Sequence, residues 1–125
     1  MTLDPSLAAK PYCYLTTTGR VTGKPHEIEI WFGLDGNRLY MLAGGRDGSD
    51  WVRNLRRQPQ VTQRIRDQTF AGLAGIVTDP DEDALARRLL VEKYTAGYSG
   101  NLSGWGRTAL PVYVDLMPGP EALPI

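Results

Sequence analysis

A run of hydroxyl and cationic side chains between residues 16 and 26 is the first part of this sequence that could do chemistry. Threonines occupy positions 16–18, and Arg20, Thr22, Lys24 and His26 follow within a segment punctuated by glycine and proline. Turn amides that face solvent beside cations form a natural anion site. An ordinary polar hairpin has the same composition, so spacing alone leaves both interpretations open.

A second candidate segment lies between residues 42 and 54. It opens with Leu42, Ala43, Gly44 and Gly45 and continues to Asp50, Trp51 and Asn54. Glycines let the backbone approach a ligand closely, and a helix start offers free N–H groups to an anion. The alternative is a connecting loop followed by a tryptophan that docks a short helix.

Other chemistries lack the residues they need. Cys13 and His26 are the single cysteine and the single histidine, so a zinc site of the usual kind is not expected and no metal is predicted. The sequence has no Gly-x-Ser-x-Gly elbow and no complete phosphate loop. We interpret Cys13 as a buried inert thiol. Glu27 and Glu29 share one strand face, which we expect to be solvated or to contact another subunit.

Two helices and six strands are expected to position these segments. Asp35-Gly36-Asn37 is a strong hairpin signal, and Asp79, Pro80 and Glu82 form the pattern of a helix start. A short helix between Ser49 and Pro59 must dock through Trp51 and Leu55, because about eight residues are marginal alone. The predicted strands cover 10–18, 26–32, 38–43, 60–66, 69–78 and 108–117, and the predicted helices follow Ser49 and run from Asp79 to Tyr94.

The connections favour a mainly β fold with an antiparallel sheet. Tight turns join most of the strands, and six such strands with two helices suggest a small barrel with helices outside it, open on one side. Pro111 in the last strand indicates an edge position or a bulge. We expect one domain over residues 1–117 and a C-terminal tail over residues 118–125.

Composition narrows the class of partners. The chain has 125 residues, with 14 basic residues balancing 14 acidic ones. No overall field draws it to nucleic acid, and no window has the ~20 apolar residues of a membrane span. We therefore expect a cytoplasmic protein that acts on a small molecule, with no nucleic-acid partner.

Four stretches together resemble a known family. They are LTTTGRVTGKPHEIEIWF from Leu15, DGNRLYMLAGG from Asp35, DWVRNLRRQPQVT from Asp50, and KYTAGYSGNLSGWGRTALPVYVDL from Lys93. The chain resembles the deazaflavin (F420)-dependent nitroreductase-like family of FMN-binding-type split β-barrels. The resemblance implies coenzyme F420 as cofactor and hydride transfer to a quinone, an enone or a nitro compound.

The resemblance also implies a role for each matching residue. The turn from Arg20 through Thr22 to Lys24 would lie at the cofactor's phosphate and acidic tail, and His26 would grip the phosphate. Trp31 would border the ring system, and Tyr98 would lie near the substrate as a proton donor. Backbone at Leu42, Ala43, Gly44 and Gly45 would line the ring, and Asp50, Trp51 and Asn54 would close the site.

Two positions depart from the family pattern. Val21 replaces a frequent lysine, and Gly44-Gly45 replaces a frequent Ser-Lys pair, so cationic and hydroxyl contacts to phosphate are lost. Two alternatives therefore stay open: an FMN-binding split-barrel reductase or oxidase, and a non-enzymatic protein that binds a flavin, haem or an apolar ligand. A homodimer is also implied, because split barrels of this kind often complete the groove with a second subunit.

Overall fold

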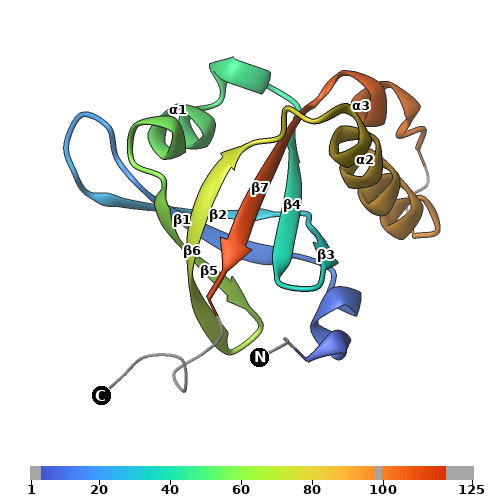
Figure 1. Ribbon diagram of the computed structural model, residues 1–125, viewed down its shortest axis with the longest axis horizontal. Helices are drawn as coiled ribbons and strands as arrows, with labels where there is room; N and C mark the ends of the chain where they lie inside the picture. The colour runs from blue at the N-terminus through green and yellow to red at the C-terminus, as the bar shows by residue number, and fades with distance from the viewer. Residues whose placement is uncertain (1–3, 98–99, 118–125) are drawn as a thin grey trace.

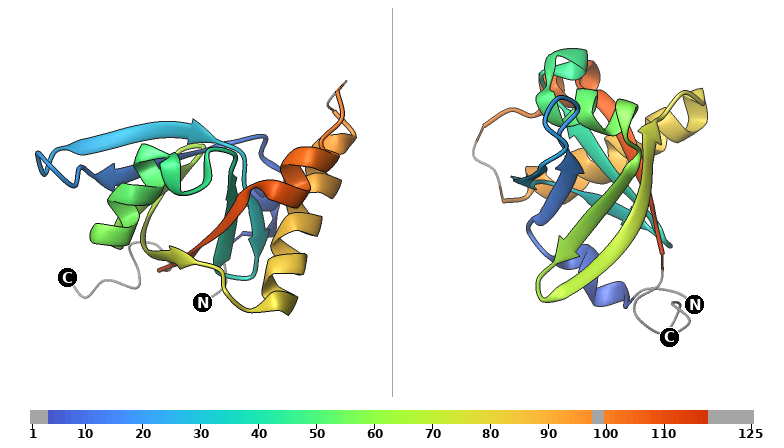
Figure 2. Two further views of the ribbon diagram at one scale, coloured as in Figure 1. Left: turned by 90° about the horizontal axis from the view of Figure 1, so that it is seen from above. Right: turned by 90° about the vertical axis from the view of Figure 1, so that its left-hand side faces the viewer.

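The computed structural model describes residues 4–97 and 100–117, and an antiparallel sheet dominates this part of the chain (Figure 1). Its seven strands lie in the order β2-β1-β5-β6-β7-β4-β3. The strands are β1 (Cys13–Thr18), β2 (Pro25–Ile30), β3 (Gly33–Asp35), β4 (Arg38–Ala43), β5 (Gln60–Ile65), β6 (Gln68–Ile76) and β7 (Leu110–Leu116). The sheet curls into a half-barrel whose two edge strands are β2 and β3, which confirms the predicted fold class (Figure 2).

Helices cover two separate parts of this half-barrel. The α-helices of the described residues are α1 (Asp50–Arg57), α2 (Pro80–Thr95) and α3 (Ser103–Thr108), and short 3₁₀ turns form η1 (Pro5–Ala9) and η2 (Arg46–Gly48). Helix α1 lies beside the β1–β2 turn, whereas α2 and α3 pack together at the opposite side (Figures 1 and 2). The predicted short helix and the predicted long helix are both confirmed.

The strand count differs from the expected six because a short strand forms just past the end of the predicted strand 26–32. The chain leaves β2 after Ile30 and forms the short strand β3, which pairs with β4 through the predicted turn at Gly36. Gly36 has a φ of 60°, which glycine adopts without steric cost. Phe32 between the two strands is fully buried, so the break turns this side chain into the barrel core.

Helix α3 overlaps a segment, residues 97–106, whose four glycines are typical of a loop rather than of a helix. A side chain at Gly106 would come within 2.4 Å of the Val91 side chain on α2, so glycine is what allows the two helices to approach. The expectation for Pro111 was also wrong, because β7 lies between β6 and β4. Pro111 lies near the start of β7, one residue before the last β6–β7 pair, Ile76 with Val112, and its carbonyl accepts from the Val77 N–H at 3.0 Å. A proline is tolerated at such a strand start.

Strand β4 is buried on both faces and joins two hydrophobic cores. Leu39 and Met41 point into the half-barrel, whereas Tyr40 and Leu42 pack against α2 and its neighbours. The end of the half-barrel is closed by α1, whose Val52 and Leu55 are 0% and 1% exposed. Burial of each such side chain contributes about 1.5–3 kcal/mol. This packing stabilises a helix of eight residues, which would be only marginally stable on its own.

Candidate cofactor site

The turn between β1 and β2 is held in shape by its own backbone. The Gly19 N–H donates to the Lys24 carbonyl at 2.7 Å, and the Lys24 N–H donates to the Thr22 hydroxyl at 3.2 Å. The His26 ring covers Gly19 so closely that a Cβ there would lie 2.7 Å from His26 Nε2. Glycine at position 19 therefore lets the imidazole fold back against the turn.

Arg20 is tied to helix α1 by a polar network. Its guanidinium donates to Asn54 Oδ1 at 2.8 Å and to Asp50 Oδ1 at 3.2 Å, and its backbone N–H donates to Asn54 Oδ1 at 3.2 Å. Asn54 is 4% exposed, and its amide donates to the Thr17 hydroxyl at 3.1 Å. We call Thr17, Arg20, Asp50 and Asn54 the α1 network. It fixes the turn to the helix, so one rigid wall carries Arg20.

A cavity of about 460 Å³ opens between this turn, β2 and α1. Six of the twelve predicted cofactor-binding residues line it, namely Arg20, Thr22, His26, Asp50, Trp51 and Asn54. Glu27 and Ile28 of β2 also line it, together with Thr17, Gly19 and Val21. The carboxylates of Asp50 and Glu27 partly offset the charge of Arg20, which makes this cavity polar rather than strongly cationic.

A second cavity of about 480 Å³ begins where the first ends along β2. Glu29 and Ile30 line it, directly after the two β2 residues of the first cavity. Its other walls are Trp31, Leu42, Asn101, Leu102 and Trp105. The two cavities therefore follow one strand from a polar end to an aromatic end.

The aromatic end is built from stacked rings. The Trp31 indole lies parallel to the Tyr94 ring at a centroid distance of 4.2 Å, and Trp105 meets it edge-on at 5.6 Å. Burial raises the pKa of Tyr94 to about 12. Its hydroxyl accepts from the Phe32 N–H at 2.9 Å, which fixes the position of the ring behind Trp31. This arrangement can hold a flat conjugated ligand by stacking and apolar contact.

The remaining predicted site residues lie in different surroundings. Ala43 is 2% exposed and belongs to the barrel core. Gly44 borders the aromatic end, since a Cβ there would lie 3.7 Å from Trp105 Cδ1, whereas a Cβ at Gly45 would meet the Ser49 hydroxyl at 2.7 Å. Lys24 is exposed and lines neither of the two cavities. Tyr98 lies outside the described residues.

Sequence reasoning missed several lining residues. Glu27 and Glu29 are exposed as expected, and they pair with Arg64 at 3.7 Å and with the Tyr14 hydroxyl at 3.0 Å, but they also line the two cavities. Because β2 is an edge strand, its free side is available as a wall, which strand alternation alone does not reveal. Leu102 and Trp105 have the i, i+3 spacing of a helix face, and this signal could have identified the wall formed by α3.

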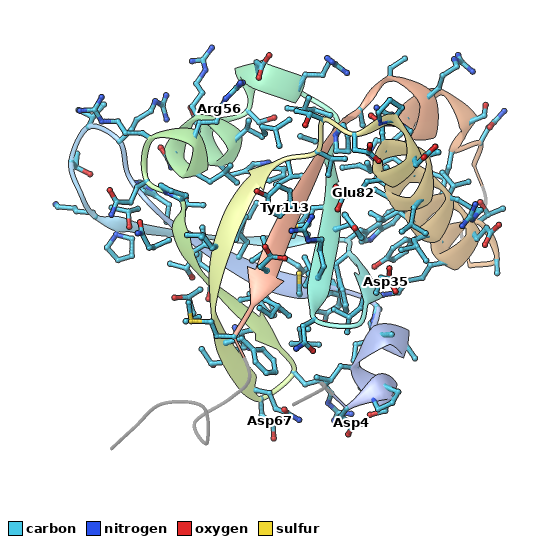
Figure 3. All side chains as sticks on the ribbon, viewed as in Figure 1. Asp4, Asp35, Arg56, Asp67, Glu82 and Tyr113 are labelled. Carbon is cyan, nitrogen blue, oxygen red and sulfur yellow. The ribbon has the colours of Figure 1, made fainter. Side chains whose placement is uncertain are left out.

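Beside the polar end, α1 presents a cationic outer face. Arg20, Arg53, Arg56, Arg57 and Gln58 line an open groove of about 800 Å³. Arg56 pairs with Asp47, and Arg53 Nε donates to the Asp47 carbonyl at 3.0 Å. Figure 3 shows Arg56 projecting from α1 away from the half-barrel. We call Arg53, Arg56 and Arg57 the basic face of α1.

Solved structures with the same fold include proteins that handle flavin-type cofactors. An F420-H2-dependent reductase superposes with a TM-score of 0.66 at 21% identity, covering 86% of this chain and 94% of that one. A FAD-binding protein from Mesorhizobium loti gives 0.65 at 15% identity, covering 94% and 93%. A domain-swapped dimer gives 0.68 at 21% identity, covering 92% and 82%. The fold is that of the split-barrel proteins.

The family within that fold follows from the sequence. The model of the F420H(2)-dependent quinone reductase family matches residues 3–117, and the chain belongs to this family. It is accordingly an F420-dependent oxidoreductase. No helix in the described residues is long and apolar enough to cross a membrane. Across residues 4–97 and 100–117, no group of three or more His, Cys, Asp or Glu side chains is placed to hold a metal ion.

Proposed function

We propose that the protein reduces a small electron-poor organic acceptor, a quinone in the first instance, with hydride from reduced F420. The observation that carries this proposal is the pair of cavities along β2. Glu27 and Ile28 line the polar one, and Glu29 and Ile30 line the aromatic one. A cofactor with a flat ring and an anionic tail matches that succession of walls.

The residues fit such a cofactor at both ends. Trp31, Leu42 and Trp105 offer an apolar wall for a deazaflavin ring, and Gly44 lets backbone border it. Arg20, Thr22 and His26 would face the phosphate. The basic face of α1 would attract the acidic tail, a charge contribution that compensates for Val21 and for Gly44-Gly45.

The chemistry is divided between cofactor and protein. When bound, F420 supplies the hydride. The protein's contribution is to orient the ring and to exclude water, with the stacked Trp31 and Tyr94 as a rigid support. Tyr98 remains our proposal for the group that protonates the reduced acceptor, by its resemblance to a family tyrosine. Tyr98→Phe is expected to lower kcat and to leave F420 affinity unchanged.

The direct test is a fluorescence titration of purified protein with oxidised and reduced F420, with FMN in parallel. We expect F420 to bind and FMN to bind at least tenfold more weakly. A preference for FMN would replace the cofactor and keep the fold. If neither F420 nor FMN binds, the alternative of a non-enzymatic binding protein for another ligand is favoured. Turnover of a benzoquinone or a naphthoquinone with reduced F420, against a nitro compound and an enone, then ranks the acceptors.

We also propose that the chain forms a homodimer. Its edge strand β2 is exposed or half-buried along its whole length, and the wall it forms is open to another subunit. The similar fold of a domain-swapped dimer supports this proposal. Light scattering during gel filtration tests it, because a monomeric mass across the micromolar range would contradict it.

A further inference from the structure

A third cavity lies behind the aromatic end, on the side of the N-terminal segment. Its volume is about 360 Å³, within the range of ligand pockets, and its walls include Pro11, Tyr12, Trp31, Lys93 and Tyr94. Trp31 lines both this cavity and the aromatic cavity along β2. The proposed reduction of an acceptor assigns no role to this cavity or to its lysine.

Lys93 supplies the one cationic side chain of the walls that the structure describes. Its amine donates to the Phe32 carbonyl at 2.9 Å and lies 3.6 Å from the centroid of the Phe32 ring and 5.1 Å from that of Tyr94. No ion pair joins it to a carboxylate among residues 4–97 and 100–117. A half-buried cation with only a carbonyl and ring faces for partners loses solvation that a carboxylate would restore.

The titration behaviour of the cavity agrees with this geometry. Burial lowers the pKa of Lys93 to about 8. Burial raises the pKa of the Cys13 thiol and of the Tyr94 hydroxyl, each to about 12, so both stay neutral between pH 6 and about 10. Tyr12, on the segment before β1, adds a phenol wall, and the Phe32 and Pro11 carbonyls add acceptors that disfavour a second negative charge. An anionic ligand there should carry a single charge.

We propose that this cavity binds a small aromatic carboxylate, with its carboxylate on the Lys93 amine and its ring against Tyr12 and Trp31. The amine provides a charge-assisted hydrogen bond, and the ring provides the apolar contact that the remaining walls require. One ring or two fused rings match the cavity volume of about 360 Å³. The proposal does not depend on the reaction that we assign to the two cavities along β2.

Calorimetric titration of the protein, without F420, with benzoate and 2-naphthoate at pH 7 tests the proposal. Benzamide and 2-naphthamide are the matched neutral probes. We expect carboxylate affinity to fall at least tenfold in Lys93→Met, to be kept within threefold in Lys93→Arg, and to be unchanged in Arg88→Met, which removes an exposed cation from the same helix. Thermal melts confirm that each variant is folded.

A pH series adds an independent readout. Carboxylate affinity should fall at least fivefold between pH 7 and pH 9.5, because Lys93 loses its proton there, while Lys93→Arg should stay flat. The proposal is overturned if neither carboxylate binds at millimolar concentration, if the amides bind as well as the acids, or if Lys93→Met retains full affinity. F420 binding, measured separately, is expected to be present in every case.

Discussion

Two polar networks tie helices to the sheet of this protein, and they differ in how fully their charges are paired. The α2 network consists of Arg38, Tyr40, Glu82 and Asp115. Arg38 donates to Asp115 at 2.7 Å and to Glu82 at 2.6 Å, and the Tyr40 hydroxyl donates to Glu82 at 2.7 Å. Figure 3 shows Glu82 on the side of α2 that faces the sheet, where β7 carries Tyr113, and the Tyr113 ring lies under the Arg38 guanidinium.

The α1 network has a similar composition, but its charged groups are less completely paired with one another. Arg20 shares its donors with Asn54 and with Asp50, but the Asp50 side chain is 85% exposed, against 22% for Glu82. Arg20 and Asp50 also form part of a cavity wall. The α2 network holds the pKa of Glu82 low through Tyr40 and Arg38, so its charges serve each other. Charges that are incompletely paired at a cavity are those available to a ligand.

The largest expected effect comes from breaking the α1 network at its centre. Asn54→Ala removes the acceptor of the Arg20 backbone and guanidinium and the donor to Thr17. We expect the free energy of unfolding to fall by about 1–3 kcal/mol, because buried polar groups lose their partners. F420 affinity should fall at least tenfold, since the turn is released. Urea denaturation and F420 titration measure the two effects, and unchanged F420 affinity in a folded variant would contradict the proposed site.

The matched change in the α2 network should affect stability alone. Glu82→Gln weakens the contacts to Arg38 and Tyr40, and we expect a loss of about 1–2 kcal/mol in the free energy of unfolding. F420 affinity should stay within twofold of the unmodified protein. A tenfold loss of F420 affinity here would remove the distinction between the two networks.

A smaller effect is expected from the basic face of α1. Arg53→Ser with Arg57→Ser should weaken F420 binding about three- to tenfold, because the acidic tail loses charge attraction. A deazaflavin without phosphate and tail serves as control and should bind both proteins equally. The difference in F420 affinity should shrink in high salt. If F420 and the control deazaflavin lose affinity equally, the basic face of α1 does not bind the acidic tail.

The last expected effect is confined to alkaline pH and is the pH dependence of stability contributed by Lys93. Its pKa is about 8 in the folded protein against an ordinary 10.5, so the unfolded chain binds more protons between these values. Stability from this group therefore rises with pH across that window. The unmodified protein should gain stability relative to Lys93→Met between pH 7 and pH 10.5, as measured by urea denaturation at both values. A constant difference would show that the amine is not desolvated.

Local signals explain what could be predicted from the sequence. The turn at Gly36 and the helix start at Asp79 depend on neighbouring residues, and both are found; the Asp79 side chain accepts from the Glu82 N–H at 2.9 Å. The Glu82 side chain, however, reaches across to Arg38 instead of closing a capping box. Gln63, a polar residue between Val61 and Ile65 in β5, is fully buried, and its amide contacts Met41 Sδ at 3.6 Å.

Features that depend on distant contacts were beyond such reasoning. Helix α3 forms where Gly106 meets Val91, and the edge position of β2 follows from how the whole sheet curls. The site shows the same division. Arg20, His26 and Trp51 of the polar cavity come from two segments whose chemistry is visible in the sequence, whereas Leu102 reaches the aromatic cavity through the packing of α3 on α2.

The burial of strand β4 on both faces determines how this molecule unfolds. Since alternate residues of β4 belong to the barrel core and to the core under α2, neither core can come apart without exposing the other face of the same strand. The two layers should therefore unfold as one cooperative unit. In native-state hydrogen exchange, the amides of β4 and of its partner β7 should be the last to exchange, with the same free energy as global unfolding.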